Sequence, residues 1–194
     1  MMIEIYTDGS SMKSRSGWGF VAVRNGEIIH TESGQESADR TNQQMELIAA
    51  IRGLSWWSNT FHSLTDSVIV FSDSAYLINC YTERWYDNWQ NNGWRNSKKE
   101  PVANQFLWDR LIPFFESDRC SFLKVKGHSG HIYNELADKL AQGIVLSDDD
   151  LTRNKNDDII NIKLSEILVD YSMKKFPVKE TIERIKEVMR GYNG

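Results

Sequence analysis

The stretch VIVFSDS at residues 68–74 decides the fold class, because four apolar residues in a row lead directly into Ser72 and Asp73. A strand without polar alternation is buried on both faces, which is typical of a strand with parallel neighbours. Parallel strands need a crossover connection, and a helix before this stretch would supply one. The pattern therefore predicts an α/β sheet in which this strand runs parallel to an earlier one.

The expected crossover helix begins at Thr41-Asn42-Gln43-Gln44, which has the form of a capping box. Apolar residues then recur at helical spacing and predict one buried face: Leu47, Ala50, Ile51, Leu54 and Trp57. Glu46 borders that face, so we expect its carboxylate at the edge of the core.

Three segments rich in β-forming residues precede this helix, at 3–7, 17–24 and 27–35. Asn25-Gly26 joins the last two, and this dipeptide favours a tight hairpin because both turn positions need a positive φ. The opening of the chain is therefore predicted to be an antiparallel meander whose first strand lies beside 68–71.

Acidic residues stand at the ends of these elements. Asp8 and Asp73 close the two strands predicted to be parallel neighbours, where α/β sheets bind ligands. Helices would bring Glu46 and Asp138 to the same place. Hard cations such as Mg²⁺ prefer oxygen ligands, and clustered carboxylates without a cation repel one another. Singly, each residue also fits a plain structural role, as a turn former or a solvated charge.

Downstream, helices are expected over 74–81, 103–115 and 134–146, with a strand over 122–126 and a loop over 127–131. The second of these helices is predicted to bury Phe106, Leu107, Leu111 and Phe114. The third is predicted to bury Leu136, Ala137, Leu140, Ala141 and Ile144.

Composition narrows the class of protein. The 194 residues are 40% hydrophobic and carry a net charge of −4, which indicates a globular chain and does not favour unspecific binding of nucleic acid. We see no secretory signal and no membrane span, and Cys80 and Cys120 have no metal-like spacing. These features predict a cytoplasmic protein that has no contact with membranes.

The sequence divides into three regions. Residues 1–146 hold all the elements above and form the predicted catalytic domain. Residues 147–158 carry five Asp and are predicted to be a solvated, mobile linker. Residues 159–194 form an extension of unknown role, with amphipathic helices expected over 164–174 and 178–190.

Five motifs occur in a fixed order: TDGS, TNQQMELIAAI, VIVFSDSAY, WYDNWQNNGWRNSKKEPVANQFLW and VKGHSGHIYNELADKLA. In this order they resemble ribonuclease H of type 1 over residues 1–146. The resemblance implies an RNase H-like fold, with a five-stranded mixed sheet of three antiparallel strands and then parallel strands, flanked by helices. It also implies a nuclease that hydrolyses the RNA strand of RNA–DNA hybrids endonucleolytically, leaving 5′-phosphate and 3′-hydroxyl ends.

The same resemblance implies the catalytic residues. Asp8, Glu46, Asp73 and Asp138 match carboxylates that hold two Mg²⁺ ions, with Mn²⁺ as a possible substitute, and Asp8 would bridge the ions. His128 matches a mobile histidine that assists the leaving group or product release.

Nucleic-acid contacts are implied as well. Trp89 matches an aromatic residue that stacks on a deoxyribose, and Asn42 and Gln43 match residues that contact the minor groove. Thr41 and Asn104 match members of a DNA phosphate pocket. Asn42 also fits a role in capping its helix, and tryptophans at this spacing are also typical of a core.

The family pattern is not complete. Asp39 stands where the phosphate pocket has arginine, and Gln90-Asn91-Asn92 stands where several relatives carry basic residues. Two other functions therefore stay open, a hybrid-binding module that does not cut and a nuclease or strand-transfer enzyme of the same fold that acts on DNA. We expect a monomer, and the sequence suggests no protein partner.

Overall fold

A computed structural model describes residues 2–63, 65–127 and 131–152 of the chain. The chain divides into two compact units, and Met1–Arg24 with Ile28–Leu151 forms the first of them. Every site residue described below belongs to this first unit. Within the described ranges, no helix combines the length and the apolar character that a bilayer crossing requires.

One mixed sheet organises this unit, with its strands in the order β3-β2-β1-β4-β5. The strands are β1 Met2–Met12, β2 Arg15–Arg24, β3 Glu27–Glu36, β4 Ser67–Ser72 and β5 Cys120–Lys124. β1 pairs antiparallel with β2 and parallel with β4, and β4 pairs parallel with β5. The predicted five-stranded sheet, antiparallel and then parallel, is confirmed.

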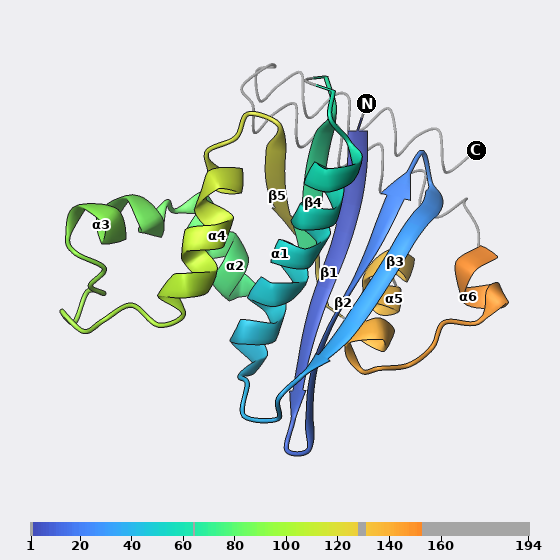
Figure 1. Ribbon diagram of the computed structural model, residues 1–194, viewed down its shortest axis with the longest axis horizontal. Helices are drawn as coiled ribbons and strands as arrows, with labels where there is room; N and C mark the ends of the chain where they lie inside the picture. The colour runs from blue at the N-terminus through green and yellow to red at the C-terminus, as the bar shows by residue number, and fades with distance from the viewer. Residues whose placement is uncertain (1, 64, 128–130, 153–194) are drawn as a thin grey trace. The chain divides into compact units, whose positions relative to one another are not determined.

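Helices cover both faces of the sheet (Figure 1). They are α1 Asn42–Thr60, α2 Ala75–Thr82, α3 Trp85–Asn91, α4 Gln105–Phe115, α5 Ile132–Ala141 and α6 Asp148–Thr152. α1 packs on β1 and β2 over one face, and α5 packs on the same two strands over the other. The two helices that were expected to supply Glu46 and Asp138 therefore pack on opposite faces of the same strands.

The local signals read from the sequence hold. Asn25 and Gly26 both have a positive φ, of 52° and 75°, as the two-residue turn between β2 and β3 requires. The capping box at Thr41 is present, because its hydroxyl accepts from the Gln44 N–H and the Gln44 side chain accepts from the Thr41 N–H. The whole predicted apolar face of α1 is buried.

Two side chains predicted to be buried are exposed. In α4 the buried face consists of Leu107, Trp108, Leu111, Ile112 and Phe115, so Phe106 points outward and is 54% exposed. Ile144 is 47% exposed because α5 ends early, at Ala141. Gly143 has a φ of 73°, and the amides of Gly143 and Ile144 donate back to Leu140 and Lys139, which closes the helix in a Schellman motif.

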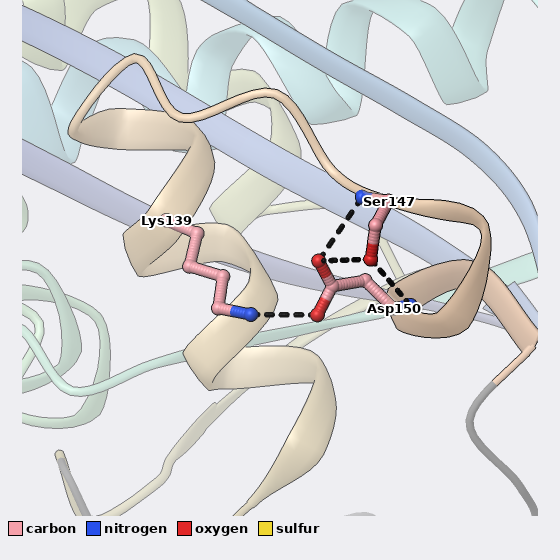
Figure 2. A network of polar contacts seen from close by, with 3 residues as sticks. All are labelled: Lys139, Ser147 and Asp150. Carbon is pink, nitrogen blue, oxygen red and sulfur yellow. Dashed lines mark hydrogen bonds and ion pairs between the residues drawn. The ribbon is translucent and has the colours of Figure 1, made fainter.

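Part of the predicted linker is a helix. Ser147 caps α6, because its hydroxyl accepts from the Asp150 N–H at 3.2 Å while Asp150 Oδ2 accepts from the Ser147 N–H at 3.1 Å. Lys139 Nζ of α5 donates to Asp150 Oδ1 at 2.6 Å (Figure 2). Residues 148–152 therefore form a short helix that the sequence did not predict, with Asp150 as a cap and an ion-pair partner, while most of 147–152 is exposed. The predicted mobility of this segment stays a prediction. Residues 153–158 and the two helices predicted beyond them lie outside the described residues.

Candidate active site

The sheet register brings Asp8 and Asp73 together. The parallel pairing of β1 and β4 ends at Thr7 opposite Ser72, so Asp8 and Asp73 come directly after the last pair of that ladder. β1 itself continues to Met12, and Asp8 pairs with Gly19 of β2. Both side chains are half-buried. Asp8 thus lies within β1 and not at its end as predicted, because the antiparallel pairing with β2 extends the strand. The predicted proximity of Asp8 and Asp73 is what the fold produces.

Glu46 reaches the same place from the second turn of α1. Gly9 allows this approach, because a Cβ at that position would overlap the helix backbone at Met45 and Glu46. The glycine after Asp8 therefore brings the start of α1 directly against β1. The half-buried position expected for Glu46, at the edge of the core, is confirmed.

Asp138 comes from α5, on the other face of the sheet. Its Oδ1 accepts from Gln142 Nε2, one turn later in the sequence, at 2.6 Å. Asp138 also interacts with Asp8. The four carboxylates thus come together from both faces of the sheet and from the ends of the parallel pairing.

We call this place the carboxylate hollow, a cavity of about 340 Å³. It is lined by Asp8, Gly9, Ser10, Asn42, Glu46, Asp73, Ser74, Ala75 and Asp138. All four carboxylates proposed from the sequence thus line the same cavity.

Burial and the proximity of the carboxyl groups raise the pKa of Asp8 and of Glu46 in the hollow. The pKa of Asp8 is raised to about 8, mainly by burial and further by the charge of Asp73 and the interaction with Asp138. A hydrogen bond that the Gly9 N–H donates to Asp8 lowers this pKa in part. Burial also raises the pKa of Glu46, although hydrogen bonds from Ser74 and Asn42 oppose this. A cation in the hollow would compensate the cost of holding these groups ionised.

The donors fit an open cation site. Across the described ranges, no three acidic, histidine or cysteine side chains stand close enough together to enclose one ion. Mg²⁺ is usually bound in proteins through one or two carboxylates, with water and substrate phosphate completing its shell. Four carboxylates spread around one hollow, all of them oxygen donors, suit that mode of binding.

His128 lies outside the described residues, so its predicted role is untested. Gly127, the described residue before it, lies beside the hollow, because a Cβ on Gly127 would overlap Oδ2 of Asp73. His131, within the predicted loop, is the N-cap residue of α5 without a side-chain cap bond, and its ring lies tilted against Tyr6 with the centroids 4.8 Å apart.

The residues expected to touch nucleic acid around α1 lie next to the carboxylates. Asn42 lines the carboxylate hollow and donates to Glu46 Oε1 at 2.8 Å, while Gln43 is exposed. The Gln44 side chain connects Thr41 to Asn104, since its Nε2 donates to Asn104 Oδ1 at 2.9 Å. The two predicted members of the phosphate pocket are therefore brought together. Asp39, in the pocket's arginine position, accepts a hydrogen bond from Ser37.

Trp89 lies in a second cavity, of about 530 Å³, which we call the tryptophan hollow. It is lined by Trp85, Asn88, Trp89, Asn92, Arg95, Asn96 and Ser97. The Trp89 ring is partly exposed and contacts Trp85, Trp94 and Trp108 at centroid distances of 6.2, 6.0 and 5.6 Å. The core interpretation holds in part, because Trp89 joins the core through Trp108. The ring also faces the cavity, and its contact with nucleic acid stays a prediction.

The positive charge near the tryptophan hollow is partly engaged. Arg84 pairs with Asp87, with Nε and Oδ2 2.6 Å apart, and Arg95 Nη1 donates to the Lys99 carbonyl at 2.7 Å. Lys98 and Lys99 remain exposed. The surface is only weakly basic, as Gln90-Asn91-Asn92 in the sequence indicates.

Sequence reasoning missed Ser74, a buried residue whose hydroxyl donates to Glu46 Oε2. The pattern of a strand end followed by serine and a helix predicts a helix cap, and Ser74 does cap α2. Its second contact depends on how α1 packs against α2, for which the local sequence gives no signal.

Comparison with known proteins places this site in a family. The sequence profile of the family described as RNase H matches residues 1–145. A Ribonuclease H of Syntrophomonas wolfei is 46% identical over 153 residues, which cover 75% of this chain and 97% of that protein. A Ribonuclease H of Caldanaerobacter subterraneus is 41% identical over 142 residues, covering 72% and 88%.

Solved structures agree. The foamy viral protease-reverse transcriptase in complex with RNA/DNA hybrid aligns with a TM-score of 0.61 and 26% identity, over 73% of this chain and 19% of the viral chain. The resemblance carried by the five motifs is confirmed, and this chain belongs to the RNase H family of enzymes.

Proposed function

We propose that this chain hydrolyses the RNA strand of RNA–DNA hybrids endonucleolytically, with two divalent cations bound in the carboxylate hollow. The observation that carries the proposal is the convergence of Asp8, Glu46, Asp73 and Asp138 on one cavity. Membership of the RNase H family and the hybrid-bound viral structure support the choice of substrate.

Asp8, Glu46, Asp73 and Asp138 would hold the cations, which we propose to be Mg²⁺, with Mn²⁺ as a substitute. Such a pair supplies an activated water on one side of the phosphorus and stabilises the leaving oxygen on the other. Asp8 is the best candidate for a shared ligand, because it interacts with both Asp73 and Asp138.

The chain's own residues then orient the substrate. We propose that Asn42 and Gln43 contact the minor groove, where RNA displays its 2′-hydroxyls. The bond from Asn42 to Glu46 at the hollow and the exposure of Gln43 support this proposal. Glu46 would itself contact a 2′-hydroxyl. Thr41 and Asn104 would receive a DNA phosphate, and Trp89 a deoxyribose.

The reaction adds water across one phosphodiester bond. Hydroxide joins the phosphorus, the bond from phosphorus to O3′ breaks, and O3′ takes up a proton. The products are a 3′-hydroxyl end and a 5′-phosphate end. We propose that His128 assists by supplying a proton or by helping product release, in keeping with the ability of histidine to exchange protons near neutral pH.

Three further expectations from the sequence remain proposals. We propose that the catalytic domain spans 1–146, that the chain acts as a monomer, and that it resides in the cytoplasm. The last proposal is supported by Cys80 and Cys120, which are both buried free thiols, as suits a reducing compartment.

The test is cleavage by the full chain of end-labelled RNA–DNA hybrid, single-stranded RNA, duplex DNA and duplex RNA, with Mg²⁺ and with EDTA. We expect internal cuts in the RNA of the hybrid alone, only with the cation, and 5′-phosphate ends that a phosphatase removes. Tight binding of the hybrid without turnover in Mg²⁺ or Mn²⁺ would instead identify a binding module. Cleavage of duplex DNA would identify a DNA-directed enzyme.

A further inference from the structure

Glu46 is held at both of its carboxylate oxygens. Asn42 Nδ2 donates to Oε1 at 2.8 Å, and Ser74 Oγ donates to Oε2. Asn42 is exposed and lies one turn earlier on the same helix, whereas Ser74 is 4% exposed and belongs to the link between β4 and α2. The contact from Ser74 is therefore the one that ties Glu46 to another part of the fold.

The surroundings of Ser74 orient its hydroxyl. The oxygen accepts from the Leu77 N–H at 3.3 Å, which caps α2, and the Ser74 N–H donates to Ser72 Oγ at 3.2 Å. A hydroxyl has one proton to donate and two lone pairs. With a lone pair directed to Leu77, its single proton is available to Glu46.

We propose that Ser74 is a positioning residue for the active site, which fixes the Glu46 carboxylate relative to Asp73. Ser74 follows Asp73 directly in the chain, so one residue couples the end of β4 to α1 across the hollow. This inference rests on the proposed function, because it concerns the same cation site. It assigns to Ser74 a role in cation binding and turnover beyond its role as a helix cap.

A purely structural role makes a different prediction. If Ser74 only caps α2, its loss lowers the stability of the fold and leaves cation affinity and kcat unchanged in the folded protein. If Ser74 positions Glu46, its loss weakens cation binding even where the protein is fully folded. Outer partners that orient ligands typically change metal affinity or activity by about 10- to 100-fold.

The experiment compares three variants of the full chain. Ser74→Ala removes the hydroxyl, Ser74→Thr restores a hydroxyl at the same atom, and Ile78→Val weakens the packing of the same helix without touching Glu46. Mg²⁺ affinity is measured by calorimetry without substrate, kcat and KM with RNA–DNA hybrid, and Tm by circular dichroism.

We expect Ser74→Ala to weaken Mg²⁺ binding and to lower kcat, each by about 10-fold or more, with KM for the hybrid nearly unchanged. Ser74→Thr should recover most of both losses. Ile78→Val should lower Tm while its Mg²⁺ affinity and kcat stay at the level of the unsubstituted chain.

The outcomes separate the two proposals. If Ser74→Ala loses only Tm, as Ile78→Val does, the positioning role is wrong and the proposed function is unaffected. If the unsubstituted chain binds Mg²⁺ but does not cut hybrid, weaker Mg²⁺ binding by Ser74→Ala still supports positioning while the proposed function fails. An unsubstituted chain that binds no Mg²⁺ overturns the positioning role.

Discussion

The carboxylate hollow and the tryptophan hollow rest on different kinds of support. Four elements meet at the carboxylate hollow, and the register of β1 against β4 sets the positions of Asp8 and Asp73. The tryptophan hollow is lined by residues of the seven-residue helix α3 and of the turns after it (Figure 1 shows these segments). Short-range bonds hold those turns, such as the Val102 N–H to the Trp94 carbonyl at 2.9 Å.

The tasks proposed for the two hollows match this difference in support. Hydrolysis of a phosphodiester needs ligands held to within a fraction of an ångström, which strands and helices of a sheet provide best. Contact with a nucleic-acid backbone carries no sequence information and tolerates small displacements. We therefore infer that substitutions in the carboxylate hollow act mainly on kcat, and substitutions in the tryptophan hollow mainly on KM.

The largest effect is expected from Asp8→Asn. This change removes the carboxylate that interacts with both Asp73 and Asp138, so cleavage of hybrid should fall by more than about 100-fold. The measurement is single-turnover cleavage at saturating Mg²⁺. A variant that keeps cleaving hybrid at the normal rate would exclude Asp8 as a catalytic residue.

Asp8→Asn should lower activity, but it should raise the stability of the fold when cations are absent. Since the pKa of Asp8 is about 8 in the folded chain and about 3.8 otherwise, the folded state binds the extra proton. The stability of the metal-free protein therefore falls as pH rises from about 4 to about 8. Glu46, whose pKa burial also raises, adds to this slope.

Urea unfolding in EDTA at several pH values measures this slope. Asp8→Asn should be more stable than the unsubstituted chain near pH 8 by at least about 1 kcal/mol, and its slope should be shallower. Identical slopes for the two proteins would show that Asp8 ionises without cost in the hollow.

The next effect concerns the support of the carboxylate hollow. Gly9→Ala places a Cβ against the backbone of Met45 and Glu46, so α1 must move away from β1. We expect a loss of about 1–3 kcal/mol in stability and a fall of about 10- to 100-fold in kcat. Gly93→Ala is the control, because a Cβ there meets nothing within 4 Å although its φ is +71°. It should lower stability without changing kcat.

How much of this site the sequence predicts depends on the range of the signal. Asp8 and Asp73 are predictable because each follows a run of β-forming residues, and parallel strands end at one edge of a sheet. The start of α1 is predictable because a capping box is local. Ser74 as a partner of Glu46 is not, since that contact depends on the packing of α1 against α2.

The errors of prediction have the same origin. Helical spacing from Leu107 and Leu111 predicts that Phe106 is buried, but this spacing does not define the edge of the buried face. In the structure Trp108 and Phe115 belong to that face, and Phe106 lies outside it. Ile144 continues the apolar pattern of α5 in the sequence, but Gly143 ends the helix before it. Periodicity alone marks a helix, while its caps and neighbours set which residues it buries.

A smaller effect should come from the tryptophan hollow. Trp89→Ala removes a partly exposed ring that faces the cavity, so we expect KM for hybrid to rise about 10-fold with kcat nearly unchanged. Trp89→Phe keeps an aromatic face and should recover much of the affinity. Binding titrations at two salt concentrations measure the effect. A loss confined to kcat would mean that the two hollows do not divide the work as inferred.

The smallest effect is expected from Asp150→Ala, which removes the ion-pair partner of Lys139, the residue after Asp138 in α5. The bond from Lys139 is the main cause that lowers the pKa of Asp150 to about 2, so this contact should persist above pH 4 and be lost as pH falls toward 2. Asp150→Ala should remove the protection of the α6 amides from hydrogen exchange, whereas Asp149→Ala, in the same turn, should keep it. We expect kcat to stay unchanged in both, because Gln142 and Asp8 already fix Asp138. A fall in kcat for Asp150→Ala alone would mean that α6 also helps to hold the carboxylates in position.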